Sequence, residues 1–317
     1  MSPIRLLLCS LFCLLLSACG QAPAPDPSQS QSGARRKPQI GLVLKTMTNP
    51  YFVSMEQGAR RAAREYGVQL IVRSAAAETS VEQQNQLLSD LIEQKVDAIV
   101  FAPSDSMRLI PQLKRAQQAG IKLVNIDNRL NPDGLAHAGM HKLPFVGVNN
   151  EKAAYEAVRH LLAPFKGPAR AAILEGLPIA SNAQERLRGA RRALAEKPQI
   201  KLVASVVGNW RIDDGRLVMK QILQKNPQLD ALFCANDMMA LGAMQAMQEE
   251  GRKEIRIAGY DGLDDVRKAV RDGKVAATVD QQPDLQGYHG VRLAYLQLQG
   301  QTVPASMEIP ALLVLPP

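Results

Sequence analysis

The feature that most restricts the fold is a steady alternation of apolar, strand-like runs with helical patterns along most of the chain. It begins with the apolar run at 40–44, enters a helical pattern at Pro50, and repeats to about residue 298. Such runs are typical of parallel strands covered on both faces, and helices connect them by right-handed crossovers. Because so many strands would make a single sheet unusually wide, we expect an α/β fold with two doubly wound parallel-sheet lobes.

The expected elements follow one another in order along the chain. Strands are expected at 40–44, 69–72, 98–102, 121–126, 145–148, 169–174, 200–206, 231–235, 255–259 and 275–279. Helices are expected at 50–66, 81–92, 109–119, 153–162, 183–195, 215–223, 238–248, from 263 onward and at 285–298. The stretch from 130 to 144 has no clear period and is expected to be irregular.

The amino terminus has the features of an export signal. Arg5 precedes an apolar run at 6–16 that is too short to span a membrane. The four residues ending in Cys19 resemble the lipobox of bacterial lipoproteins, which predicts a signal peptide at 1–18 and a lipidated Cys19. Residues 19–38, rich in Ala, Pro, Ser and Gln, are expected to include a disordered tether. A cytosolic chain with a buried first helix is the alternative.

Composition argues against several classes of protein. The net charge of +8 is not concentrated in a dense basic run with aromatic residues, so a dispersed basic surface is favoured over a nucleic-acid partner. Outside the leader and Cys19 only Cys234 remains, which leaves no internal disulfide and no cysteine metal cluster. The four histidines lack metal-ligand spacing, and motifs for nucleophilic, phosphate-binding or zinc catalysis are missing from the sequence. We therefore expect no enzyme activity, no catalytic residues, no metal and no cofactor.

Polar side chains gather where the predicted strands end. Asn49, Asp127, Asn236, Asp261 and Gln281 all lie at a strand end or just after one. Ligands of open parallel sheets bind beyond the carboxyl ends of the strands. These five residues are therefore candidates for a common binding site.

Four segments carry a family resemblance. Residues 44–52, 233–242, 259–262 and 277–281 resemble segments of the ribose- and allose-binding proteins that supply bacterial ABC sugar importers. The similarity covers about residues 39–315. Lys45, which follows the first strand, matches the allose binders, whereas ribose binders have a small polar residue there. The resemblance implies a type I periplasmic binding protein fold, which is a pair of α/β lobes joined by a three-strand hinge.

The resemblance also implies where the chain crosses between the lobes. The crossings fall near 148–150, 281–282 and 310, so the amino-terminal lobe would contain 39–148 plus 282–309. The other lobe would contain 149–281 plus 310–317. Asn149 and Asn150 are candidates for the hinge, and whether either contacts ligand is left open.

Carried over residue by residue, the resemblance implies a sugar-binding site. Polar groups would bind the hydroxyls and flat rings would cover the faces of the sugar. The expected ligand-binding residues are Lys45, Asn49, Tyr51, Phe52, Asp127, Asn128, Arg186, Trp210, Asn236, Asp261 and Gln281. Asn128 stands where ribose binders have arginine and is either a ligand contact or a surface residue; with Lys45, this departure favours a hexose over ribose.

Each candidate also has a structural alternative. Asn236 could serve only as a helix cap, and Asp261 before Gly262 could be a simple turn. Arg186 could belong to a solvated helix face, and Lys45 could extend to solvent. The pair Tyr51 and Phe52 could be core packing.

The resemblance implies a function as well. A monomeric, lipid-anchored solute-binding protein, exported to the periplasm or outer cell surface, would capture a monosaccharide by hinge closure and deliver it to an ABC permease. A sugar-sensing receptor subunit that signals to a chemoreceptor or histidine kinase is the alternative. A repressor of the lactose-repressor type would need an amino-terminal helix-turn-helix, where this chain has an export leader.

Overall fold

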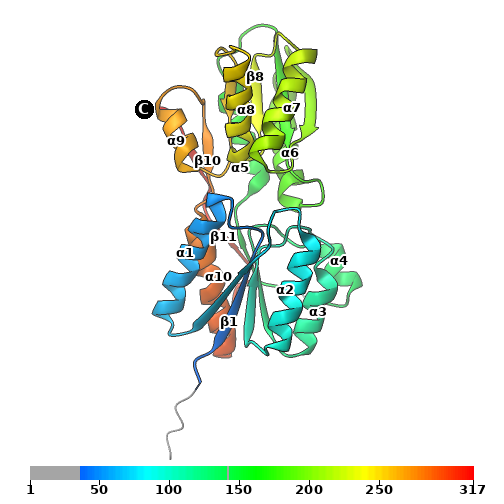
Figure 1. Ribbon diagram of the computed structural model, residues 1–317, viewed down its shortest axis with the longest axis vertical. Coiled ribbons are helices and arrows are strands. Elements are labelled where there is room, and N and C mark those ends of the chain that lie inside the picture. Colours follow the sequence, from blue (N-terminus) through cyan, green and yellow to red (C-terminus); the bar gives the residue numbers. More distant parts are fainter. Residues whose placement is uncertain (1–35, 141–142) are drawn as a thin grey trace, which may run out of the picture. The chain divides into compact units, whose positions relative to one another are not determined.

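The computed structural model describes residues 36–140 and 143–317. The predicted signal peptide, Cys19 and the predicted tether as far as residue 35 lie outside this range. Residues 37–317 form one compact unit built around separate sheets. Two of these sheets each organise a lobe, which we call the first lobe and the second lobe (Figure 1).

The first lobe is built on a six-stranded sheet in which every neighbouring pair is parallel. Its order is β11 (Ser306–Glu308), β5 (Phe145–Gly147), β4 (Lys122–Ile126), β3 (Ala98–Phe101), β1 (Gln39–Leu44) and β2 (Gln69–Ser74). Strands β1 and β3 are interior strands of this sheet and are almost entirely buried, as their apolar runs predict. β11 lies near the carboxyl terminus, so a segment far along the chain from the other five strands completes the sheet of this lobe.

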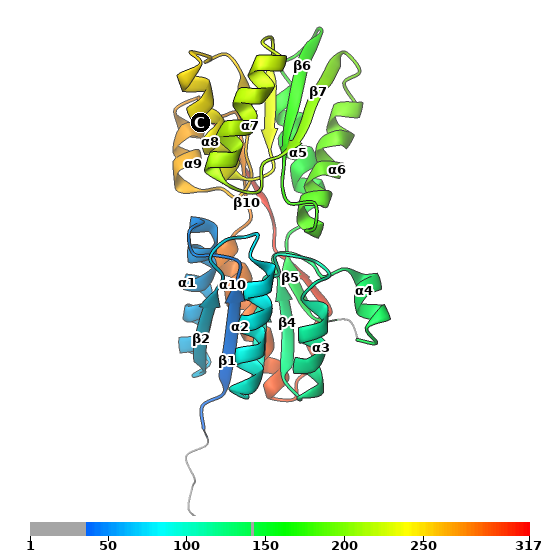
Figure 2. The ribbon, with the colours of Figure 1, turned by 45° about the vertical axis from the view of Figure 1, so that its right-hand side comes forward.

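Helices cover both faces of this sheet (Figure 2). Helices α1 (Pro50–Glu65) and α10 (Pro283–Leu298) share one core with Leu42, whereas α2 (Val81–Glu93) and α3 (Ile110–Gln118) share another with Val43. Successive residues of one strand thus face opposite layers, as the twofold period of a strand requires. A short helix, α4 (Pro132–His137), follows β4.

The second lobe contains a four-stranded parallel sheet and five helices around one core. The strand order is β7 (Ile200–Val207), β6 (Ala169–Glu175), β8 (Ala231–Cys234) and β9 (Arg256–Ala258). The helices are α5 (Asn150–Leu162), α6 (Ser181–Ala195), α7 (Ile212–Lys225), α8 (Asp237–Glu249) and α9 (Asp264–Arg271). α5 packs against α6 and α7 against α8, and Cys234 is buried in the core, as expected of a small core residue.

Three segments connect the two lobes. The chain passes from β5 to α5, from β10 (Thr278–Asp280) to α10, and from β11 to β12 (Leu312–Val314), and β10 pairs with β12 in an antiparallel ladder. Gln282 lies in the second connection with a left-handed φ of 50°. Its side-chain Nε2 donates to the carbonyl oxygen of Pro310 over 2.7 Å, which ties the second connection to the third.

The predicted alternation of parallel strands and helices is confirmed, but three short elements were missed. α4 lies in the stretch expected to be irregular, and β11 and β12 follow the last predicted helix. Helix α4 has six residues and the two strands have three each, too few for a period to stand out. Within 36–140 and 143–317, no helix combines the length and the apolar character needed to cross a membrane.

Candidate functional site

A small cavity lies where the carboxyl ends of strands from both lobes meet. Its first-lobe wall contains Lys45, Asn49, Tyr51, Phe52, Glu78 and Asp127, and its second-lobe wall contains Asn182, Arg186, Trp210, Asn236, Asp261 and Gln281. Ten of these are predicted site residues that the fold brings together. Glu78 and Asn182 were missed, and Asn128 does not line the cavity.

Asp127 anchors the first-lobe half of the site. It follows β4, and its Oδ2 lies 2.7 Å from Lys45 Nζ, just beyond the end of β1. Tyr51, in the first turn of α1, donates its hydroxyl to Asp127 Oδ1 over 3.1 Å. Lys45 is 2% exposed, so its side chain does not extend to solvent, as the alternative interpretation supposed.

Asn49 and Glu78 form the outer part of the same half. Asn49 caps α1 through Oδ1, which accepts from the backbone N–H of Tyr51 over 3.0 Å, and its Nδ2 donates to Glu78 Oε1 over 3.1 Å. Glu78 Oε2 also lies 4.0 Å from Lys45 Nζ. Burial raises the pKa of Glu78, although Lys45 and Asn49 oppose the rise. Glu78 is in the turn after β2, where no periodic pattern singles out any residue.

Arg186 is the central cation of the second-lobe half. It is 3% exposed, so the solvated-face alternative is wrong. Its Nε donates to Asn150 Oδ1 over 2.9 Å, its Nη1 donates to the carbonyl oxygen of Ala235 over 2.8 Å, and the guanidinium lies 3.8 Å from the centroid of the Tyr260 ring. Asn150, a hinge candidate, thus orients Arg186 from outside the cavity lining. Asn149 is exposed and caps α5.

Asp261 faces Arg186 within this half. Its Oδ1 lies 3.6 Å from Arg186 Nη1 and accepts a hydrogen bond from Gln281 Nε2 over 2.6 Å. Burial raises the pKa of Asp261 well above its usual range, and the nearby Arg186 opposes that rise. Asp261 therefore does more than form a turn before Gly262, because its carboxylate is part of the cavity wall.

Trp210 supplies the flat apolar wall of the second lobe. Its carbonyl oxygen accepts from Asn236 Nδ2 over 3.2 Å, while Asn236 Oδ1 caps α8 by accepting from the N–H of Met239. Asn236 is therefore both a helix cap and a cavity residue. Trp210 has a left-handed φ of 65°, and a Cβ on Gly176 would lie 1.9 Å from the indole ring. Only glycine at 176 leaves room for the ring.

The two halves of the cavity are bonded separately. Within the described residues, every hydrogen bond or ion pair recorded between lining residues joins residues of the same lobe. The open space between the halves is only about 10 Å³, which is room for about one water molecule. A larger guest therefore enters only when the lobes or their side chains move apart, and it would then bridge both halves.

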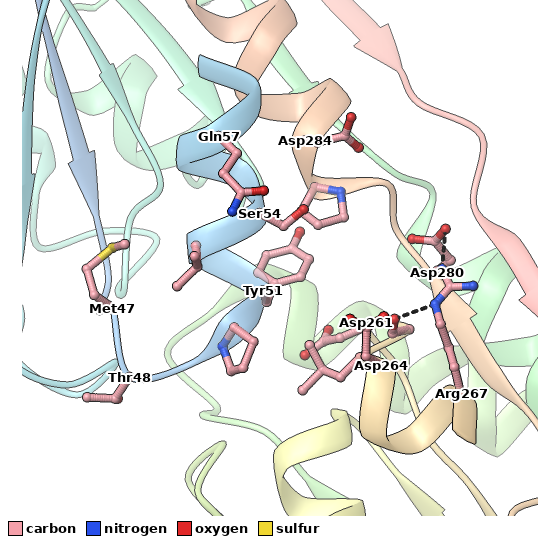
Figure 3. A pocket seen from close by; sticks show the side chains of 15 residues that line it. Met47, Thr48, Tyr51, Ser54, Gln57, Asp261, Asp264, Arg267, Asp280 and Asp284 are labelled. Carbon is pink, nitrogen blue, oxygen red and sulfur yellow. Dashed lines mark hydrogen bonds and ion pairs between the residues drawn. The ribbon is translucent and has the colours of Figure 1, made fainter. Parts of the chain in front are cut away.

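Two open clefts adjoin the cavity. The first, of about 620 Å³, shares Tyr51 and Asp261 with the cavity, and the second, of about 500 Å³, shares Asn49, Glu78 and Trp210. Figure 3 shows the first cleft between α1 and the start of α9, where an ion pair of 2.6 Å joins Arg267 and Asp280. Both clefts give solvent a short path to the cavity wall.

Besides the two clefts, the site is bordered by direct contacts between the lobes. Ser106 Oγ accepts from the backbone N–H of Ser181 over 2.9 Å, and Asn128 Oδ1 accepts from the N–H of Asn182 over 3.1 Å. Asn128 Nδ2 donates to the carbonyl oxygen of Pro103 over 2.9 Å. The interpretation of Asn128 as a surface residue is therefore wrong, since it is buried in the contact between the lobes.

The chemistry available at this site is that of binding. Two cations and three carboxylic acids surround the cavity together with amide groups and aromatic rings. Across the described part of the chain, no group of three or more His, Cys, Asp or Glu side chains is arranged to hold a metal ion. The arrangement suits a small, neutral guest with several hydroxyl groups, because such a guest both donates and accepts hydrogen bonds.

Comparison with known proteins places the chain in a family. The model of the periplasmic binding protein domain matches residues 40–302. The D-ribose/D-allose-binding protein of Pseudomonas aeruginosa is 37% identical over 84% of this chain and 84% of its own length. The D-allose-binding periplasmic protein of Escherichia coli is 33% identical over 84% of this chain and 86% of its own.

Solved structures agree. An ABC transporter periplasmic solute binding protein from Actinobacillus succinogenes, with bound D-allose, is 38% identical to this chain and superposes with a TM-score of 0.84. The match covers 88% of this chain and 98% of that one. The predicted resemblance to ribose- and allose-type binding proteins is thus confirmed. From its sequence, its strand order and its likeness to these structures, the chain belongs to the periplasmic binding protein family.

Proposed function

We propose that this protein is the substrate-binding lipoprotein of an ABC sugar importer and that it captures a monosaccharide for delivery to the permease. The observation that carries the proposal is the cavity between the lobes, whose walls combine charged groups, amides and aromatic rings. Relatives with the same fold are named for binding D-ribose and D-allose. In this proposal the chain makes and breaks no covalent bond.

The charges of the cavity favour a neutral guest. Lys45 and Arg186 are opposed by Asp127, Asp261 and Glu78, and burial raises the pKa of the last two, so that they hold a proton more readily than in water. The positive and negative groups are therefore nearly balanced before any ligand binds. A sugar offers hydroxyls to both kinds of group and adds no charge.

Closure of the lobes would couple binding to transport. Because each half keeps its own hydrogen bonds, a sugar that contacts both halves makes its full set of contacts only when they are close together. Binding then shifts the population toward the closed form. The permease would recognise that form.

Two residues of the first lobe support the choice of a hexose. Lys45 lies against Asp127, and Asn128 serves the lobe contact in place of the arginine of ribose binders. Both departures favour a hexose such as D-allose over D-ribose. A hexose brings one more hydroxymethyl group, which Lys45 and Glu78 could meet at the outer end of the cavity.

The same proposal includes the location of the protein. We propose that residues 1–18 direct export and that the chain is held at a membrane by lipid on Cys19, as a monomer on a tether that ends near residue 38. Two or more acyl chains provide stable anchoring where one gives only reversible binding. The lobes would then work in the periplasm or at the outer cell surface.

Calorimetry with D-allose and D-ribose tests the proposal. We expect D-allose to bind, and Asp261→Ala to weaken its binding by about 1–3 kcal/mol, because the hydrogen bonds of this carboxyl group to the sugar are lost and Arg186 loses the group beside it. Asp265→Ala, an exposed carboxylate of α9, is the matched control and should leave affinity unchanged. If the wild-type protein binds neither sugar nor any other pentose, hexose or polyol in a thermal-shift screen, the proposal is wrong.

A further inference from the structure

Asn182 is a cavity residue whose side-chain oxygen is buried without a partner within the described residues. It lies in the first turn of α6, one helical turn before Arg186, so both side chains are on the same face of the helix. The residue is 3% exposed and lines the cavity. Its side-chain Oδ1 is buried and has no hydrogen-bond partner among the described residues.

An unpartnered amide oxygen in such a place is unusual. Buried polar groups nearly always have a partner, because leaving one unpaired costs its full desolvation free energy. The amide oxygens of two other cavity residues do have partners: Asn49 Oδ1 accepts from the N–H of Tyr51, and Asn236 Oδ1 accepts from the N–H of Met239. Asn182 Oδ1 is thus an acceptor in the second-lobe wall that no other protein group satisfies within the described chain.

The backbone of Asn182 is fixed independently of that oxygen. Its N–H donates to Asn128 Oδ1 across the lobe contact, which holds the start of α6 in place when the lobes are close. The side chain is therefore presented to the cavity by a bond that exists only in the closed arrangement. A guest would meet this acceptor as the lobes come together.

We propose that Asn182 Oδ1 accepts a hydrogen bond from one hydroxyl of the bound sugar and so helps to select which sugar is retained. The inference rests on the proposed function, because it names a further contact in the same site. A sugar that lacks that hydroxyl, or carries it on the opposite face of the ring, leaves the oxygen unpaired and is rejected.

The test compares Asn182→Ala with the wild-type protein by calorimetry, using D-allose, D-ribose and the monodeoxy derivatives of the better ligand. We expect the substitution to weaken binding of the parent sugar about tenfold or more, equal to about 1.4 kcal/mol. One monodeoxy sugar should bind the wild-type protein weakly and should lose no further affinity in the variant. Gln184→Ala, at an exposed position on the same helix, is the control. It should leave the affinity for the parent sugar and for the monodeoxy sugars unchanged.

The possible outcomes separate the two proposals. If the wild-type protein binds a sugar and Asn182→Ala binds it within twofold, the inference is overturned while the proposed function stands. An equal loss for the parent sugar and every monodeoxy derivative would show a structural role only, and would also overturn it. If the wild-type protein binds no sugar, both the proposed function and the inference about Asn182 are wrong. Unfolding temperatures without sugar establish that the variant is folded, and alanine is well tolerated in a helix.

Discussion

Asp127 and Asp261 line the cavity in backbone conformations that most residues avoid. Asp127 has φ of 63° and Asp261 has φ of 128°, and Trp210 shares this property. Such conformations cost about 1–3 kcal/mol each and persist only where the surrounding structure enforces them. Here the enforcing contacts are the side-chain bonds of each lobe, since Lys45 holds Asp127 and Gln281 holds Asp261. In these conformations both carboxylates lie in the wall of the cavity.

How far single residues could be predicted depended on their position relative to the strands. Asp127 and Asp261 follow buried strands, so the strand-end rule found them, and the resemblance supplied Arg186 and Trp210. Asn128 stands next to Asp127 but turns into the lobe contact, because its neighbour's left-handed backbone redirects the chain. Asn182 could not be found from the pattern, since a polar residue at the start of a helix is ordinary capping chemistry.

Asp237 leads to a prediction about pH. It is fully buried, its carboxylate accepts from Thr278 Oγ1 and the N–H of Leu263, and burial raises its pKa from 3.8 to about 6. The native state therefore binds the proton more tightly than the unfolded state. Stability from this group is fully present below pH 4 and is lost as pH rises through 6, by about 3 kcal/mol in all.

Asp237→Asn should remove this part of the pH dependence, because the amide stays neutral. Urea unfolding at pH values from 4 to 7 should show the variant gaining stability relative to wild type as pH rises. Asp133→Asn, at an exposed position in α4, is the control. A difference between Asp237→Asn and wild type that stays constant across this range would contradict the prediction.

Helix α6 shows how one element joins the two lobes. Its own N-cap, Ala180, has no side-chain hydrogen bond, and its first two N–H groups are capped by Ser106 and Asn128 of the other lobe. The free N–H groups of a helix start require partners. Separation of the lobes therefore exposes the start of α6 to water, and closure satisfies it again.

Loss of these caps should shift the lobes toward the open form. In Ser106→Ala and Asn128→Ala we expect weaker sugar binding, by about 0.5–2 kcal/mol each, although neither residue lines the cavity. Calorimetry measures the affinity, and small-angle X-ray scattering of the sugar-free protein should show a larger radius of gyration. Asn131→Ala removes a cap within the first lobe, at α4, and should lower thermal stability without changing affinity. Equal affinity for all four proteins would contradict the prediction.

At the level of elements, length decided what the sequence could reveal. The long helices α1 and α10 have clear starts, with Pro50 and Pro283 in the first turn, and were placed within a few residues. α4 was missed because it is too short to bury a periodic face. β11 was missed because two of its three residues are polar and exposed, so it has no apolar signal, and β12 was missed because its apolar run is only three residues long.

For the whole molecule, the count of strands predicted two sheets, but the size of the space between them was not predictable. That space depends on side chains from several distant segments meeting at one place. The domain limits at 148, 281 and 310 and the roles of the site residues remain predictions, as does the anchor at Cys19. These features depend on residues from separate segments or on other molecules, and the hydrophobic period of a single segment carries no information about either.

The proposed anchor is tested by fractionation of cells that express the full chain. Cys19→Ser should move the protein from the membrane fraction to the soluble fraction, because lipid cannot be attached. Cys13→Ser, within the predicted leader, is the matched control and should leave the protein in the membrane fraction. Metabolic labelling with a fatty acid should follow the same pattern. A Cys19→Ser protein that remains labelled and membrane-bound would contradict the prediction.

The separate bonding of the two cavity walls has a consequence for kinetics. When the lobes part, Lys45 stays with Asp127 and Arg186 stays with Asp261, so neither wall has to be rebuilt before the next capture. An arriving guest meets a surface that is already ordered, which removes one cost of association. Its residence time is then governed by how often the lobes part. The rate of release, and with it the pace of uptake, then depends on the three connecting segments and on the contacts of Ser106 and Asn128 with the start of α6.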